Sequence, residues 1–216
     1  MKLFGNKKPD LFESLLNIQY GDQLFQKLTS LQNEINVAYD TKVIALTSCE
    51  NDSLVAAFAK ALADTYAANG SSSMIIDANL YNPCLEKVLN KSKAITGNVK
   101  ESGMMVQDGS VNGSYKMSFL NRKTSIITID KQIYPGAVFK NKIIQKWIND
   151  GSKNYDHFII IAPSIKKHKE VLLLNDVIKS MVLITQRNIT KKKDIFDVIS
   201  YSRENNLPLA KTVVIE

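Results

Sequence analysis

Cysteines and long apolar runs are scarce in this chain, and each shortage excludes a class of protein. The 216 residues include two cysteines, Cys49 and Cys84, which lie far apart and outside any C-x-x-C motif. Neither a disulfide framework nor a zinc site is therefore expected. No stretch approaches the roughly 18 apolar residues of a membrane-spanning helix, and "MKLFGNKKPD" lacks the apolar core of a signal peptide. The sequence predicts a cytoplasmic protein with no membrane span.

Aromatic residues do not accompany the basic segments of the chain. The formal net charge is +7, and short basic runs stand at residues 166–169 and 191–193. Such a balance favours acidic surfaces as partners. Neither run is interleaved with the aromatic side chains that stack on bases, and no dense arginine cluster occurs. Nucleic acid is therefore not the expected partner, and a solvated basic face is the simpler interpretation.

Apolar runs alternate along the chain with amphipathic segments. Six continuous runs are typical of strands: 43–46, 74–77, 125–129, 158–162, 181–185 and 212–215. Helices are predicted between them at about 53–69, 84–90, 137–150, 169–179 and 190–206. Because the strands are continuously apolar, we expect them to be buried on both faces. The alternation predicts a three-layer α/β/α fold with a doubly wound, mainly parallel sheet.

Two segments fall outside this alternation. Residues 1–40 carry Leu24, Leu28 and other apolar residues at helical spacing, which predicts an N-terminal helical segment of one or two helices. Residues 41–216 would form the α/β domain, within a single globular domain overall. Residues 91–120 are polar and contain four glycines, so a loop-rich insertion with short elements of its own is expected.

The turn after the first strand lacks what a phosphate-binding loop needs. In open parallel sheets, ligands bind beyond the carboxyl ends of the strands, and G-x-x-x-x-G-K-[ST] is the usual loop after the first one. Its glycines let N–H groups converge on the anion, and its lysine neutralises phosphate charge. Neither glycine nor lysine occurs between residues 43 and 59.

The residues that stand there instead are polar or acidic: Ser48, Cys49, Glu50, Asn51, Asp52 and Ser53. Glu50 and Asp52 put carboxylates where an anion would lie. Asp52 or Ser53 is expected to cap the following helix, which would satisfy N–H groups that a phosphate would otherwise bind. We therefore predict a closed turn.

The segments "VIALTS", "MIIDANLYNP" and "YDHFIIIAPS", in this order and spacing, resemble the nucleotide motifs of the bacterial tyrosine kinases of capsule and exopolysaccharide systems. These kinases belong with MinD and ParA among the deviant-Walker P-loop ATPases. The resemblance covers about residues 20–216 and implies a sheet of the P-loop NTPase type. It also implies ATP-dependent protein tyrosine kinase activity, and a membrane polysaccharide co-polymerase as partner at the inner face of the membrane.

The family's site residues carry over poorly. The family has Asp-x-Asp-x-Arg after the second strand and an Asp that ends the third motif, which together hold magnesium and promote phosphoryl transfer. Here Asp77 keeps the first acid, Asn79 and Tyr81 replace the second acid and the arginine, and Ile161 replaces the last Asp. An amide brings no charge to a hard cation. The charged residues through which family members assemble into rings are absent from "FQKLTSLQ". A homo-oligomer formed through other contacts is an alternative that the sequence leaves open.

The leading hypothesis is a catalytically inactive pseudo-ATPase or pseudo-tyrosine kinase with a degenerate P-loop. It would have no catalytic residue, metal or cofactor, and would regulate or scaffold a protein partner such as the co-polymerase in capsule biosynthesis. It would be cytoplasmic, and peripheral at the inner membrane through that partner.

Two other hypotheses stay open. One is a nucleotide binder or slow tyrosine kinase that uses Mg-ATP through a non-standard loop, with Lys60 as a substitute phosphate ligand. Lys60 stands among alanines on a predicted helix, so the competing interpretation is a solvated surface lysine. The other is a ParA-like protein associated with DNA or a membrane surface, for which DNA binding would depend steeply on salt.

Overall fold

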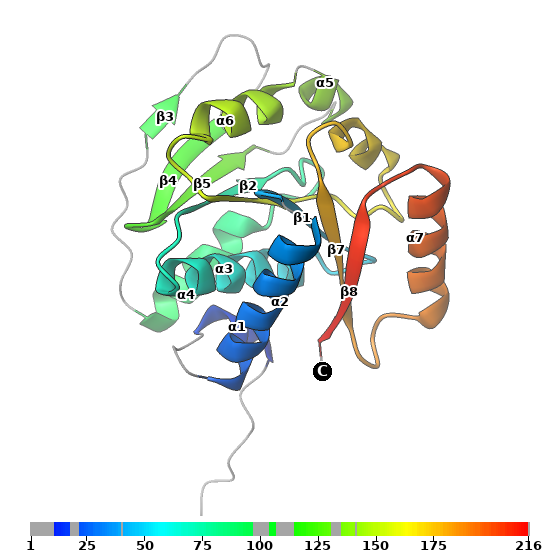
Figure 1. Cartoon of the computed structure of the whole chain (residues 1–216), viewed down its shortest axis with the longest axis horizontal. Helices are drawn as coiled ribbons and strands as arrows, with labels where there is room; N and C mark the ends of the chain where they lie inside the picture. Colours follow the sequence, from blue (N-terminus) through cyan, green and yellow to red (C-terminus); the bar gives the residue numbers. More distant parts are fainter. Residues whose placement is uncertain are drawn as a thin grey trace, which may run out of the picture.

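The computed structural model describes residues 11–17, 22–39, 41–96, 104–106, 115–130, 135–140 and 142–215. These residues form an eight-stranded sheet in the order β3-β4-β5-β2-β6-β1-β7-β8 (Figure 1). The strands are β1 Val43–Ser48, β2 Ser73–Asp77, β3 Met104–Val106, β4 Tyr115–Asn121, β5 Thr124–Ile129, β6 His157–Ile161, β7 Ser180–Gln186 and β8 Leu209–Ile215.

Six of these strands, from β5 across to β8, run parallel, and β3 and β4 add an antiparallel edge. All residues of β1 and β2 are buried, as continuous runs of Ile, Val and Leu predict for strands covered on both faces. The predicted mainly parallel α/β sheet is confirmed.

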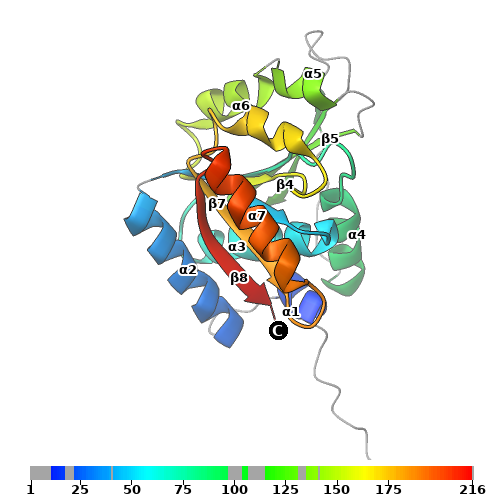
Figure 2. The same ribbon diagram turned by 90° about the vertical axis from the view of Figure 1, so that its right-hand side faces the viewer.

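Helices cover both faces of the sheet (Figures 1 and 2). They are α1 Leu11–Leu16, α2 Gln23–Tyr39, α3 Asp52–Ala68, α4 Leu85–Thr96, α5 Pro135–Lys140, α6 Ile143–Gly151, the 3₁₀ helix η1 Lys169–Leu174 and α7 Lys192–Glu204. Helices α1 to α4 share one buried apolar cluster with the sheet, and α5, α6, η1 and α7 share a second. The molecule therefore has the three layers that the sequence predicts.

The elements differ from the predicted ones in three places. The helix expected over 137–150 is broken into α5 and α6, and Lys142 at the break has a positive φ of 54°. The helix expected over 169–179 is a 3₁₀ helix that ends at Leu174. The helix expected over 84–90 extends to Thr96. The short elements expected within 91–120 are β3 and β4, which extend the sheet beyond β5.

The N-terminal helices pack on the α/β layers rather than standing apart. Leu15 and Leu16 of α1 and Leu28 of α2 are buried in the cluster that contains α3. Gln32 of α2 donates a hydrogen bond to the carbonyl of Leu62 on α3, with an N–O distance of 3.0 Å. Within the described residues, no helix is both long enough and apolar enough to cross a membrane.

Candidate functional site

The carboxyl ends of β1, β2, β6 and β7 lie side by side because these strands are neighbours in the sheet. The turn 49–53 follows β1, residues 78–84 follow β2, and residues 162–168 follow β6. These three segments together are called the carboxyl edge below. The structure therefore brings together the three turns that the sequence singles out.

Asn51 is the N-cap of α3. Its side-chain oxygen accepts a hydrogen bond from the N–H of Leu54 at 3.1 Å, and its carbonyl accepts one from Val55. The expectation that Asp52 or Ser53 caps this helix is wrong, because the helix begins at Asp52 and the cap is one residue earlier. An N-cap amide satisfies N–H groups that are otherwise available to an anion.

The first turn is also tied to the loop after β6. The hydroxyl of Ser164 donates a hydrogen bond to the carbonyl of Cys49 at 2.8 Å, and that of Thr47 donates one to the carbonyl of Pro163 at 3.0 Å. The Asn51 amide reaches the Gln186 side chain at the end of β7, at 3.4 Å. The turn is thus fixed to two neighbouring segments, as the prediction of a closed turn requires.

A basic side chain does stand beside this turn, but it is paired with two carboxylates. The ammonium of Lys166 lies 2.7 Å from a carboxylate oxygen of Asp194 and 3.4 Å from one of Glu50. The hydrogen bond to Asp194 is the main reason why the pKa of Lys166 is raised. Burial and then the Asp194 charge raise the pKa of the Cys49 thiol to about 11. Cys49 is therefore a neutral thiol, not a nucleophilic thiolate.

Asp77, at the end of β2, is fully buried and bound by the chain's own backbone. One carboxylate oxygen accepts the N–H of Asn79 at 3.1 Å, and the other accepts those of Cys84 at 3.1 Å and Leu85 at 3.0 Å. Burial raises the pKa of Asp77 to about 6, and the three N–H groups oppose that rise. The carboxylate therefore fixes the start of α4.

The two family positions after Asp77 are likewise engaged within the protein. The side-chain oxygen of buried Asn79 accepts the N–H of Asn82 at 3.4 Å, and the Asn82 amide donates to Asp52 at 2.9 Å. Tyr81 stacks on His168 of the loop after β6, with ring centroids 3.6 Å apart. These contacts connect the second segment of the carboxyl edge to the other two.

Ile161 and Ser48 end their strands without offering a free ligand at the surface. Ile161 is buried in the cluster shared with α3, and its carbonyl accepts the N–H of Ala78 at 3.0 Å. Ser48 is buried, and its hydroxyl has no hydrogen-bond partner in the described part of the chain. Ser53, at the first turn of α3, is exposed and hydrogen-bonds the Cys84 thiol.

Lys60 is a buried structural residue, so the interpretation of a solvated surface lysine is wrong. The residue is 6% exposed, and its ammonium donates to the carbonyl of Leu16 in α1 at 2.9 Å. It also lies 2.7 Å from the carboxylate of Asp64, one turn further from the 49–53 turn. The ammonium thus holds α1 against α3. Its role as a phosphate ligand stays an untested prediction that the observed contacts do not favour.

Mg-ATP does not fit the groups at the carboxyl edge as they are arranged. Asp77 has both oxygens bound to N–H groups, Asn79 brings no charge, and Lys166 is held by carboxylates. The described residues contain no cluster of three or more His, Cys, Asp or Glu side chains that could hold a metal ion. The contacts instead join the three segments to one another.

Several residues of this edge were not predicted as site residues from the sequence, although some of them lie within the quoted segments. Ser164, Lys166 and Asp194 come from the loop after β6 and from α7, and Asn82 comes from the loop before α4. The position of Ser164, directly after the Ala-Pro that follows β6, was the one feature from which its role could have been predicted. The pairing of Lys166 with Asp194 joins residues 28 positions apart, and no local pattern predicts it.

Comparisons with known proteins show the fold. No family model and no curated protein matches this sequence. The crystal structure of the chimerical protein CapA2B2 matches with a TM-score of 0.72 and 14% identity, over 93% of this chain and 88% of that one. The kinase domain of the Escherichia coli tyrosine kinase ETK matches with a TM-score of 0.73 and 12% identity, over 94% of this chain and 78% of that one. The BceF tyrosine kinase domain matches with a TM-score of 0.66 and 17% identity, over 93% of this chain and 80% of that one.

The chain therefore has the three-layer α/β fold of the P-loop NTPase type, as bacterial tyrosine kinase domains have it. At identities of 12 to 17%, the likeness speaks for the fold and leaves activity to be argued from the site.

Proposed function

We propose that this chain is a non-catalytic relative of the tyrosine kinase domains of capsule and exopolysaccharide systems, a pseudo-ATPase that acts by binding a protein. The observation that carries the proposal is the state of Asp77. The carboxylate that would serve magnesium accepts three backbone N–H groups of its own loop and of α4. It is used to fix the polypeptide.

Opening this site for a nucleotide would break the hydrogen bonds that Asp77 and Asn51 now make. Freeing Asp77 leaves buried N–H groups without an acceptor, at about 1–3 kcal/mol each. Displacing the Asn51 cap costs about 1 kcal/mol more. The 49–53 turn offers no lysine in exchange, and its Glu50 and Asp52 repel a polyphosphate. The balance favours the closed arrangement.

The partner and the place follow from the resemblance together with the shared fold. A domain of this fold without nucleotide chemistry can still act by binding a protein at its surface. The proposed partner is a membrane polysaccharide co-polymerase or another protein of the same system. The chain would work in the cytoplasm, at the inner face of the membrane, alone or as a homo-oligomer.

Calorimetric titration with Mg-ATP and Mg-ADP tests the catalytic part of the proposal. We expect no saturable heat, and no shift of the thermal midpoint at millimolar nucleotide. Three variants accompany the wild type: Asp77→Ala, Lys166→Ala and, as the matched control, Lys167→Ala. Lys167 is an exposed lysine next to Lys166, so its loss changes the charge without touching the ion pairs of the carboxyl edge.

Magnesium-dependent micromolar binding that Lys166→Ala abolishes and Lys167→Ala keeps would overturn the proposal. It would support the nucleotide-binding hypothesis instead. Lys166 is exposed, so this result does not depend on whether Asp77→Ala folds. Tight binding to random duplex DNA, lost steeply between low and physiological salt, would support the ParA-like alternative.

A further inference from the structure

Among the residues that the structure describes, strand β8 forms an edge of the sheet. It is the last strand in the sheet order, and β7 is the one described strand that pairs with it. Figure 2 shows β8 facing the viewer between α2 on one side and α7 on the other. Edge strands present unpaired backbone donors and acceptors, which proteins either protect or use for binding.

The backbone groups of Thr212 and Val214 face away from β7. The carbonyl of Val213 accepts the Thr185 hydroxyl at 3.0 Å, and that of Ile215 accepts the N–H of Arg187 at 2.8 Å, so both point toward β7. Successive residues of a strand direct their backbone groups to opposite sides. Two N–H and two C=O groups are therefore turned outward.

Protection of this edge is confined to the first half of the strand. The pairing of β7 with β8 shifts between Met181 and Val182, which marks an irregularity opposite residues 209–211, and Lys211 follows it. Bulges and lysines are the usual devices that block edge pairing. Residues 212–215, "TVVI", pair regularly and carry no charge.

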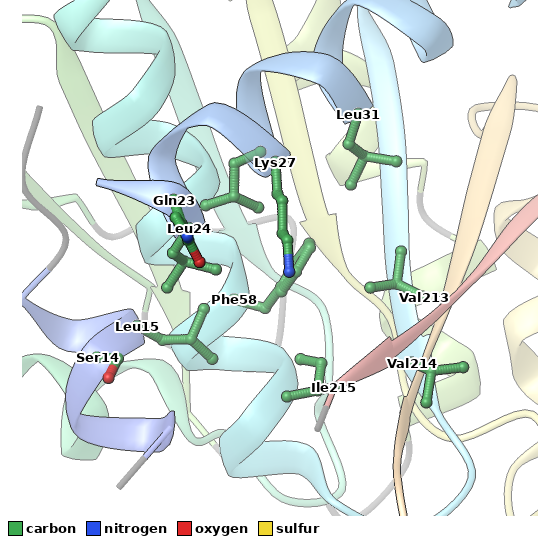
Figure 3. Close-up of a pocket in the computed structure, with 11 residues that line it drawn as sticks. Ser14, Leu15, Gln23, Leu24, Lys27, Leu31, Phe58, Val213, Val214 and Ile215 are labelled. Atoms are coloured by element: carbon green, nitrogen blue, oxygen red, sulfur yellow. The ribbon is translucent and has the colours of Figure 1, made fainter. Parts of the chain in front are cut away.

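A groove of about 570 Å³ runs beside these residues, between β8 and helices α1 and α2 (Figure 3). Leu24 and Leu28 of α2 line one wall, Val213 and Ile215 line the other, and Phe58 of α3 also contributes to the lining. Lys27 extends from α2 along this groove (Figure 3). An apolar groove with one cation suits an apolar side chain next to an acidic one.

The same side of the molecule carries exposed apolar side chains. Of the five large hydrophobic residues exposed in the described structure, three lie on β8 or on α7 and the turn before it: Val214, Phe196 and Ile189. Val214 is 57% exposed and Phe196 is 65% exposed. These side chains add apolar surface to β8 and to the helix beside it.

Charge decides between a second copy of the chain and another protein. Lys27 lies at the groove on the α2 side of β8, and Arg203 at a smaller groove on the α7 side. A second copy paired along this strand would bring its own Lys27 and Arg203 to the shared edge, where like charges repel. We propose that the β8 edge receives an extended segment of a partner protein with alternating apolar and acidic residues, which adds to the sheet as a further strand.

In this arrangement the backbone of the partner pairs with Thr212 and Val214. Apolar side chains of one face enter the groove over Phe58, and a neighbouring carboxylate reaches Lys27. Main-chain pairing gives affinity in such complexes, and side-chain pockets give specificity. The site lies on α2 and β8, and none of the residues that line its groove belongs to the carboxyl-edge turns 49–53, 78–84 and 162–168. This inference rests on the proposed protein-binding function and assigns it a surface. A negative result in the peptide experiment would not change the outcome of the nucleotide titration.

A fluorescent, end-capped nine-residue peptide of alternating valine and glutamate is the probe. Anisotropy measures its binding to the full chain, and amide exchange is followed at Thr212 and Val214. Peptides with lysine in place of glutamate, or with a central proline, serve as ligand controls. Val214→Pro removes an outward N–H without removing a β7 hydrogen bond, and Lys27→Glu reverses the charge in the groove. Lys153→Glu makes the same charge change at an exposed lysine after α6.

The expected result is saturable binding of the acidic peptide with slowed exchange at Thr212 and Val214. Val214→Pro and Lys27→Glu weaken this binding about tenfold or more, as loss of a central contact does, while Lys153→Glu has little effect. Equal weakening by Lys27→Glu and Lys153→Glu, or binding without slowed exchange at these amides, would mean adsorption to a basic surface and overturn the proposal. So would a concentration-dependent dimer in sedimentation that Val214→Pro abolishes, because a second copy would then be the occupant.

Discussion

Asn51 is the side chain on which the closed state of the first turn depends most directly. Its amide oxygen caps α3, and its amide nitrogen reaches Gln186. We expect Asn51→Ala to lower the free energy of unfolding by about 1 kcal/mol, because the N–H of Leu54 loses its acceptor. Asn51→Ser should retain most of the stability, since a serine hydroxyl can cap the same N–H. Urea denaturation of the three proteins checks this, and equal stability of the Ala and Ser variants would show that capping is not the cause.

Asp77 makes the stability of the protein depend on pH in a defined direction. Its pKa is about 6 in the folded protein, against an ordinary value of 3.8. Between these values the folded state binds more protons than the unfolded state, so this residue's contribution to stability falls as pH rises from about 4 to about 6. The full change is about 3 kcal/mol, from 1.36 kcal/mol per pKa unit.

Asp77→Asn removes this ionisation, although the amide nitrogen cannot accept an N–H and the variant is less stable throughout. The measurement is urea denaturation of both proteins at pH 4, 5, 6 and 7. The stability advantage of the wild type should shrink as pH rises through this range. Other groups, including His157 with its lowered pKa, titrate in both proteins and cancel in the difference. A difference that is constant with pH would contradict the assignment.

Among the elements, the connection from α3 to β2 depends on a glycine. Gly70 follows the C-cap of α3 with a φ of 90°, and a Cβ there would meet no atom within 4 Å. Gly70→Ala should therefore cost about 1–2 kcal/mol through backbone strain alone. Gly136 in α5 has no such φ, so Gly136→Ala should stabilise by about 0.5–1 kcal/mol. Thermal denaturation of both variants gives opposite shifts, and shifts of the same sign would contradict this explanation.

The central strands that the sequence predicted have continuously apolar residues, whereas β8, which was also expected to be buried on both faces, is only partly buried because it lies at the sheet edge. β1 and β2 are covered on both faces, so every position is selected for burial and the run is visible. β4 is only partly buried along its length, and its hydrophobic pattern is correspondingly weak. The break at Lys142 and the 3₁₀ form of η1 depend on packing between elements, which a single-sequence period does not contain.

At the carboxyl edge, the sequence indicated which groups are missing but not which groups replace them. The absent glycines and lysine and the changes at Asn79, Tyr81 and Ile161 follow from residue types alone. The stacking of Tyr81 on His168 and the pairing of Lys166 with Asp194 join segments that meet only in the folded protein. The burial of Lys60 could not be predicted for the same reason, because its ammonium donates to the carbonyl of Leu16 in α1, which is distant in the sequence.

At the scale of the whole molecule, stability should decrease from the centre of the sheet toward the β4 side. β6 lies between β1 and β2 and is almost wholly buried, whereas β4 is half-buried and near an edge. Native-state hydrogen exchange should find the amides of Ile159 and Ile160 at least roughly 100-fold slower than those of β4, or about 3 kcal/mol in opening free energy. Equal rates in the two strands would mean that the sheet opens as one unit.

The hydrogen bonds across the carboxyl edge bear on when the protein can bind and release a partner in the cell. In a cycling ATPase, the turns after the central strands rearrange when nucleotide binds and leaves, and partners follow that cycle. Here Ser164, Asn82 and Asp77 hold the same turns together through contacts within the chain. Under the proposed function, an association made by this protein would not depend on the ratio of ATP to ADP. Its extent would be governed by how much of the protein and of its partner the cell makes and removes.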